Sequence, residues 1–175
     1  TNMSEVLLDL VSGKDVIVIG NALSLNEDRL HSLIKSRNVI TCAFNKGVER
    51  FKPDIAFLNV ADHWKKRIDT HDAFTVHVSP FIRPSRTADY TIPLKIVESL
   101  RPIVGPRPSS GCIVNSFFSQ KSLNIKSVTL IGFDFKLTPT YYDQTRVPAN
   151  EPHNYEKEKD YALSHFVEKC NFNIV

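Results

Sequence analysis

Continuous runs of apolar residues recur along the chain at 15–19, 39–44, 54–60, 73–79 and 127–132. The clearest of them, such as 15–19, are rich in β-branched residues, which is typical of strands buried on both faces of a parallel sheet. After the first run, Asn26 opens a predicted helix with an apolar face at Leu30, Leu33 and Ile34, and a short helix is expected over 46–51. Because parallel strands need right-handed crossovers, we predict an α/β fold with a doubly wound, mostly parallel sheet and helices on both faces.

The second half of the chain has a more irregular pattern. Six of the ten prolines lie between Pro80 and Pro108, which predicts an irregular connection with one helix near 93–100. A capped apolar helix is expected over 109–118 and a buried strand over 127–132. Residues 133–153 show no period, which is typical of a functional lid or a disordered segment. A last helix is expected over 155–169 and an edge strand over 172–175.

Composition and charge narrow the class of protein. The 175 residues, 42% of them apolar, suit a single domain over 1–175, in which Thr1 and Asn2 precede the only methionine and are interpreted as a cloning remnant. The net charge of +3 is scattered along the chain, so it does not by itself indicate a nucleic-acid partner and equally suits a small anionic ligand. A homo-oligomer is compatible with the sequence.

The cysteines and the longest apolar windows bear on location and on metal binding. Three cysteines in no metal-binding spacing are interpreted as reduced and structural, which favours a cytoplasmic protein. No window approaches about 18 consecutive apolar residues and no signal-peptide pattern is present, so no integral membrane segment is expected. The acidic run 69–72 suits a capped turn better than a metal site, and no His-x-x-x-His motif occurs, so metal-independent chemistry is predicted.

Candidate binding residues follow the predicted strands, because ligands of open α/β sheets bind beyond the carboxyl ends of the strands. After the first strand, Gly20 permits a tight turn, Asn21 offers a donor and an acceptor, and Ser24 lies near a helix start that attracts phosphate. An ordinary turn with a capping serine fits these residues nearly as well. Asn45 after the second strand suits a base or a ribose, or equally a helix cap, and Asn59 follows the third strand.

A short stretch before the predicted helix at 109–118 combines several groups that bind anions. Arg107, Ser109, Ser110 and Gly111 bring together a guanidinium, two hydroxyls and a helix start. That combination suits an anion or a sugar, and a plain helix cap beside a solvated arginine is the alternative.

The last core strand and the loop after it supply candidate acid–base groups. Asp134 and Phe135 end the strand, and Tyr142 and His153 lie further along the loop. A tyrosine hydroxyl can bind a departing phosphate and histidine is the commonest general base, although many loop histidines are simply exposed. The basic residues beside Trp64 fit a solvated helix face better than a nucleic-acid surface.

Taken in order, these motifs resemble the bacterial sialyltransferases of the Campylobacter type. The resemblance covers most of the chain and is carried by residues 18–25, Asn45, Asn59, residues 107–111, residues 130–135, Tyr142 and His153. It implies a variant Rossmann-like fold. It also implies an inverting, metal-independent transfer of a sugar from a CMP-linked donor.

The resemblance further implies roles for individual residues. His153 matches the general base, Tyr142 a tyrosine that steadies the phosphate, and Arg107 an arginine of the donor site. Asn59 matches a contact near the leaving group. The other residues of the expected donor site are Gly20, Asn21, Ser24, Asn45, Ser109, Ser110, Gly111, Asp134, Phe135 and Lys136.

The chain departs from the family at two points of the expected site and in its length. Ala22 and Leu23 stand where the family has Gly-Pro, and Lys136 stands where it has a second phosphate tyrosine, which a lysine replaces as a point charge. The chain is also shorter. The leading expectation is a glycosyltransferase that uses a CMP- or UDP-linked sugar as co-substrate and a glycan as acceptor. The alternatives are transfer to a modified base in DNA, and a nucleotide-binding or lectin-like module without turnover.

Overall fold

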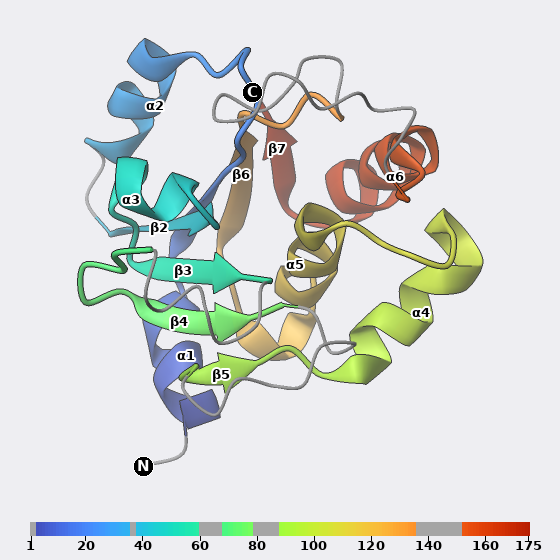
Figure 1. The fold of residues 1–175 in the computed structure, drawn as a ribbon, viewed down its shortest axis with the longest axis horizontal. Coiled ribbons are helices and arrows are strands. Elements are labelled where there is room, and N and C mark those ends of the chain that lie inside the picture. The colour runs from blue at the N-terminus through green and yellow to red at the C-terminus, as the bar shows by residue number, and fades with distance from the viewer. Residues whose placement is uncertain (1–2, 36–37, 60–67, 79–87, 136–151) are drawn as a thin grey trace.

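The computed structural model describes residues 3–35, 38–59, 68–78, 88–135 and 152–175. In these residues one sheet of seven parallel strands has the order β5-β4-β3-β2-β1-β6-β7 (Figure 1). The strands are β1 (Asp15–Ile19), β2 (Val39–Phe44), β3 (Ile55–Leu58), β4 (Phe74–His77), β5 (Tyr90–Thr91), β6 (Ser127–Ile131) and β7 (Phe172–Ile174). The doubly wound α/β fold expected from the apolar runs is confirmed, and the sheet is Rossmann-like.

Helices lie before the first strand and between several of the others. They are α1 (Met3–Val11), α2 (Glu27–Ile34), α3 (Gly47–Phe51), α4 (Leu94–Val104), α5 (Ser110–Phe118), the 3₁₀ turn η2 (Lys121–Leu123), α6 (Tyr155–Tyr161) and the π-helical segment η4 (Ala162–Val167). The expected helices near 26–34, 46–51, 93–100, 109–118 and 155–169 are confirmed. Among the described segments, no helix has the length and apolar character needed to cross a bilayer.

The alternation of side chains along each strand sorts them into two apolar layers. Val16 and Val18 of β1 join a large core with α1, α4, α5 and η4, while Ile17 and Ile19 pack under α2 with Leu30. Buried strands of this kind have no polar face, which explains the continuous apolar runs in the sequence. The sheet is therefore the middle of three layers, with α5 in front of it in Figure 1.

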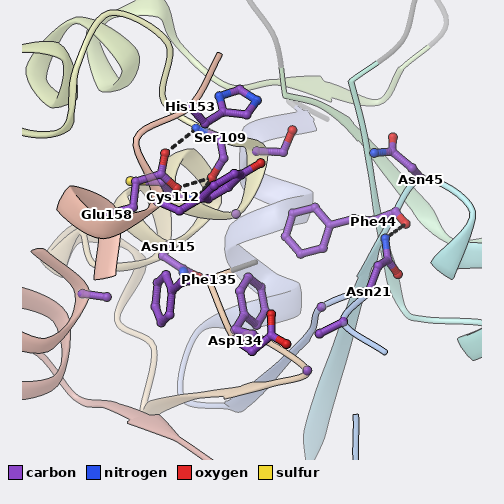
Figure 2. A pocket seen from close by; sticks show the side chains of 18 of the residues that line it. Asn21, Phe44, Asn45, Ser109, Cys112, Asn115, Asp134, Phe135, His153 and Glu158 are labelled. Carbon is purple, nitrogen blue, oxygen red and sulfur yellow. Dashed lines mark hydrogen bonds between the residues drawn. The ribbon is translucent and has the colours of Figure 1, made fainter. Parts of the chain in front are cut away.

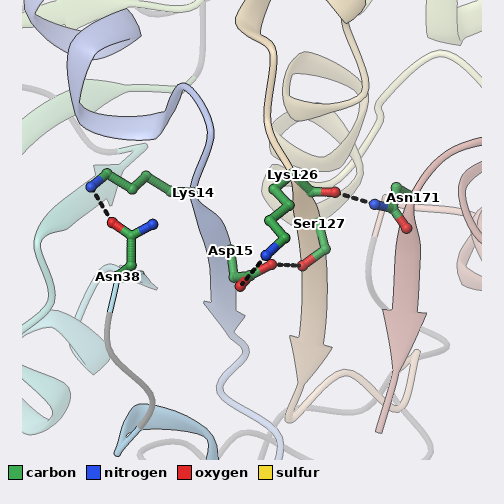
Figure 3. Close-up of polar contacts among 6 residues, drawn as sticks. All are labelled: Lys14, Asp15, Asn38, Lys126, Ser127 and Asn171. Carbon is green, nitrogen blue, oxygen red and sulfur yellow. Dashed lines mark hydrogen bonds and ion pairs between the residues drawn. The ribbon is translucent and has the colours of Figure 1, made fainter.

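Side-chain pairs at the amino ends of the strands fix the register. Asp15 at the start of β1 accepts a hydrogen bond of 2.5 Å from the Ser127 hydroxyl of β6 and lies 4.0 Å from the Lys126 ammonium (Figure 3). Asp54 before β3 accepts hydrogen bonds from the main chain and hydroxyl of Thr41 at 2.9 and 3.2 Å. These pairs lie near the amino ends of the strands, away from the carboxyl ends beyond which ligands of open α/β sheets bind.

The strand order reverses at β1, because β2 to β5 lie on one side of it and β6 and β7 on the other. At the carboxyl ends of β1 and β6 the two backbones nearly touch. The Gly20 amide donates to the Ile131 carbonyl at 2.7 Å, and a Cβ on Gly20 would lie 2.3 Å from the Gly132 carbonyl oxygen. In open α/β sheets such a reversal creates the crevice in which ligands bind.

Two cysteines lie inside the core. Cys42 and Cys112 are buried free thiols, and Cys170 is a half-buried one. Burial raises the pKa of Cys42 and of Cys112, which disfavours the nucleophilic thiolate form of both side chains. This agrees with the interpretation of these residues as structural.

Candidate functional site

A cleft opens at the strand reversal, above the carboxyl ends of β1, β2, β3 and β6 (Figure 2). The first turn of α5 and one side of α6 and η4 close its other wall. The cleft has a volume of about 190 Å³ and adjoins a second hollow of about 540 Å³. Asn59, Ser110 and His153 line both, so a ligand can extend from one into the other.

A chain of hydrogen bonds joins the ends of β2 and β3 to α5. The Asn45 side-chain oxygen accepts from the Asn59 main-chain amide at 3.3 Å, and the Asn59 side-chain amide donates to the Ser110 hydroxyl at 2.9 Å. Asn45 has φ +48°, a left-handed conformation that asparagine tolerates better than most residues. Its side chain therefore does not cap α3, whose N-cap position is Lys46 without a side-chain bond.

The turn after β1 is tied down by its own polar side chains. The Asn21 amide nitrogen donates to the Phe44 carbonyl at 3.1 Å, and its oxygen lies against Gly47, where a Cβ would come within 2.4 Å. The Ser24 hydroxyl donates to Asp134 at 2.9 Å and so holds the loop after β6. Ser24 does not cap α2, because the Asn26 side chain accepts from the Arg29 amide at 3.0 Å in that position.

The first turn of α5 is joined to α6 by a buried carboxylate. Glu158 is 4% exposed, and it accepts hydrogen bonds from the Ser109 main-chain amide at 2.9 Å and from the Ser109 hydroxyl. The same hydroxyl caps α5 by accepting from the Cys112 amide at 3.3 Å. Burial raises the pKa of Glu158, and the hydrogen bonds from Ser109 and the charge of His153 oppose that rise.

His153 is held by its Nδ1 atom. This nitrogen lies 2.6 Å from the Arg107 carbonyl oxygen. A carbonyl can only accept a hydrogen bond, so Nδ1 carries the proton and Nε2 of the neutral ring keeps its lone pair. The ring packs edge-on to Tyr155 at 5.7 Å between centroids. His153 is thus held in a fixed orientation beside the cleft, a contact that the sequence alone does not indicate.

Aromatic side chains form the floor of the cleft. Phe44 and Phe133 meet edge to face with centroids 6.0 Å apart. A Cβ on Gly111 would lie 2.8 Å from the Phe133 ring, so glycine is what allows that ring to approach α5. Phe135 also lines the cleft and has φ +53°. Flat rings at this site suit a flat ligand.

The structure brings most of the expected site residues together around one cleft. Its lining includes Gly20, Asn21, Asn45, Asn59, Ser109, Ser110, Gly111, Asp134, Phe135 and His153. Arg107 lines the adjoining hollow, and Ser24 contributes through its bond to Asp134. Tyr142, Lys136 and the basic stretch at 64–67 lie outside the described residues.

Comparison with models of known protein families gives no match, and comparison with curated proteins gives no match either.

The acidic run expected to cap a turn does so. The Asp69 side chain accepts from the His71 amide at 2.9 Å. Within the described ranges no group of three or more His, Cys, Asp or Glu side chains is placed to hold a metal ion.

Glu158 and Asn115 are buried polar residues of the cleft that were not among those expected from the sequence. Glu158 shares a helical stripe with Tyr155, Ala162 and Phe166, which also line the cleft. A carboxylate on an apolar stripe is a signal that the sequence does contain. Asn115 lies one turn beyond Gly111 within the apolar helix α5, and its role depends on packing that spacing alone does not define.

Proposed function

We propose that this protein is a small inverting glycosyltransferase that uses a nucleotide-activated sugar and needs no metal. The observation that carries the proposal is the histidine oriented by a backbone carbonyl beside a cleft at the strand reversal. Polar uncharged side chains and a helix N-terminus line the same cleft. A nucleotide-binding module without turnover would not require such a histidine.

The wall of Asn45, Asn59 and the first turn of α5 supports a nucleotide donor. Asparagine and serine side chains can pair with ribose and sugar hydroxyls without adding charge. The N-terminus of α5 carries a partial positive charge and amide groups that favour phosphate. The donor phosphate would therefore lie near Ser110 and Gly111, with the sugar toward the hollow that Arg107 and His153 line.

His153 would act as the general base of the transfer. Its Nε2 takes the proton of the acceptor hydroxyl while that oxygen bonds to the anomeric carbon from the side opposite the phosphate. The bond between the anomeric carbon and the phosphate oxygen breaks, and the nucleotide leaves with the electron pair. The Arg107 guanidinium would stabilise the charge on the departing phosphate, and by resemblance Tyr142 and Lys136 would assist it.

Donor turnover tests the proposal. The protein is incubated with CMP-linked and UDP-linked sugars, with a glycan or DNA as acceptor, and nucleotide release is measured. We expect release with the native protein and a loss of about 10²- to 10⁴-fold for His153→Ala. His31→Ala, an exposed histidine of α2, is the matched control and should keep full activity. Full activity of His153→Ala would contradict the assigned base, and no release from either donor class would contradict the proposal itself.

A further inference from the structure

We propose that Asn115 of α5 reads the hydrogen-bonding edge of a nucleobase at the inner end of the cleft. The inference rests on the proposed use of a nucleotide-activated donor and names the part of the cleft that would bind the base. Its starting point is a buried side-chain oxygen that has no hydrogen-bond partner in the part of the chain that the structure describes.

Asn115 is 4% exposed, and its side-chain oxygen has no hydrogen-bond partner among the described residues. A buried polar atom left without a partner typically costs about 1–3 kcal/mol. Such a group is rare in folded proteins and needs an explanation, and pairing with a bound ligand is one. Asn115 lines the cleft itself, and rotation of its amide would present the buried oxygen to a ligand there.

The surroundings of Asn115 suit a flat ring. Gly111 lies one turn earlier on the same face of α5, and Phe133 packs directly on it. Figure 2 shows Asn115 and Phe135 on the same side of the cleft, away from Asn45. Aromatic side chains bind bases by stacking, which is worth roughly 1–3 kcal/mol per base.

The chemistry of an amide matches the edge of a base. A side-chain amide offers one acceptor and two donors, and rotation by a half-turn exchanges them. It can therefore pair with the adjacent donor and acceptor of cytosine, uracil or adenine. A ribose or a hexose has no such planar pair of groups, so the inner end is assigned to the base and not to the sugar.

The position along α5 also fits a nucleotide. Asn115 and Ser110 are five residues apart in one helix, which corresponds to a rise of about 7.5 Å. That interval leaves room for a ribose between a base at Asn115 and a phosphate at the helix N-terminus. The sugar of the donor then extends past Ser110 and Asn59 into the hollow beside His153.

Calorimetry with CMP, UMP, AMP and ribose 5-phosphate tests the inference on the native protein, Asn115→Leu and Asn171→Leu. We expect at least one nucleotide to bind the native protein about tenfold or more tightly than ribose 5-phosphate. Asn115→Leu should bind that nucleotide no better than ribose 5-phosphate. Asn171→Leu is the matched control, because the Asn171 amide donates a hydrogen bond to the Lys126 carbonyl near the amino ends of β6 and β7, away from the cleft (Figure 3). The affinities of this variant should equal those of the native protein.

The melting temperature of the ligand-free variants separates a binding role from a structural one. Leucine removes an unpaired polar group without leaving a cavity, so Asn115→Leu should melt at or above the native temperature. If leucine prevents folding, Asn115→Ser replaces it and should show the same loss of affinity. Native-like affinity in the Asn115 variants, or ribose 5-phosphate binding as tightly as every nucleotide, would overturn the inference.

Binding and turnover distinguish this inference from the proposed function. Nucleotide binding that depends on Asn115, without sugar transfer, would contradict the proposed function alone. Transfer with nucleotide binding that does not depend on Asn115 would contradict this inference alone. A native protein that binds none of the nucleotides would contradict both.

Discussion

The carboxylate of Glu158 is buried between α5 and α6, and that position makes the stability of the protein depend on pH. Burial raises its pKa in the folded protein above the ordinary value of 4.5. The folded state therefore holds this proton to a higher pH than the unfolded chain does. The contribution of Glu158 to stability is greatest below pH 4.5 and is lost as the pH rises through the raised value.

Glu158→Gln should remove this pH dependence, because glutamine keeps the shape of the side chain and cannot ionise. The free energy of unfolding, measured by denaturant titration across a series of pH values, should fall less steeply for the variant than for the native protein. Glu156→Gln, an exposed neighbour on α6, is the control and should follow the native curve. Parallel curves for native protein and Glu158→Gln would contradict the burial of a titrating carboxylate.

Gly111 lies where Phe133 packs on α5, so a side chain at this position would change the shape of the cleft. In Gly111→Ala the new methyl group would come 2.8 Å from Phe133, and that ring would have to move into the cleft. Alanine is also the better helix former by about 1 kcal/mol, so the fold should lose little stability. We expect nucleotide affinity, measured by calorimetry, to fall about tenfold with a nearly unchanged melting temperature. Unchanged affinity would show that the displaced Phe133 ring does not enter the space that the nucleotide occupies.

At the residue scale, the sequence indicates some site residues much better than others. Asn45, Asn59 and Ser110 follow predicted strands or open a predicted helix, so the fold class alone brings them to one edge of the sheet. Glu158 and Asn115 lie inside helices, and only packing turns them toward the cleft. Their burial depends on how the helices pack in the folded protein. Helical spacing in the sequence predicts the buried face only approximately.

The helix α5 depends on its cap more than an ordinary helix does. Ser109→Ala removes the cap and also takes one of the two hydrogen bonds from the buried Glu158. We expect the free energy of unfolding to fall by about 1–2 kcal/mol. Ser119→Ala, which loses only a bond to the Ser116 carbonyl at 2.7 Å near the other end of α5, should cost less. Equal losses in the two variants would contradict the special role of Ser109.

The backbones at the ends of β1 and β6 lie in close contact. In Gly20→Ala a methyl group would lie 2.3 Å from the Gly132 carbonyl oxygen, and backbone cannot move aside as a side chain does. We expect a loss of about 3 kcal/mol or more in the free energy of unfolding. Gly13→Ala is the control, since its φ is +72° but nothing lies within 4 Å of the new methyl group, and it should cost about 1 kcal/mol.

At the element scale, the strands could be predicted and some connections could not. The continuous run 15–19 matches β1 in both bounds, because a strand buried on both faces has no other pattern. The two-residue strand β5 leaves no such signal within an irregular proline-rich connection, and α1 was also not expected. The π-helical segment 162–167 contains Ala162 and Phe166, which line the cleft. Contacts between distant parts of the chain accompany this geometry, and the sequence pattern does not show them.

At the scale of the whole molecule, the amino ends and the carboxyl ends of the strands have different roles. Hydrogen bonds of Asp15 and Asp54 to neighbouring strands fix the amino edge, while asparagine, serine and histidine side chains gather at the carboxyl edge. The strand order could be expected only in outline from the sequence. The reversal at β1 follows from where β6 pairs, and that pairing decides which strand ends form the cleft.

Nuclear magnetic resonance of the sugar during turnover tests the central claim most directly. The native protein is mixed with a CMP-linked or UDP-linked sugar and an acceptor, and the anomeric configuration of donor and product is followed. The account predicts that the donor signals disappear, free nucleotide accumulates, and the product has the opposite configuration. Unchanged donor signals for every nucleotide sugar, or a product of retained configuration, would contradict it.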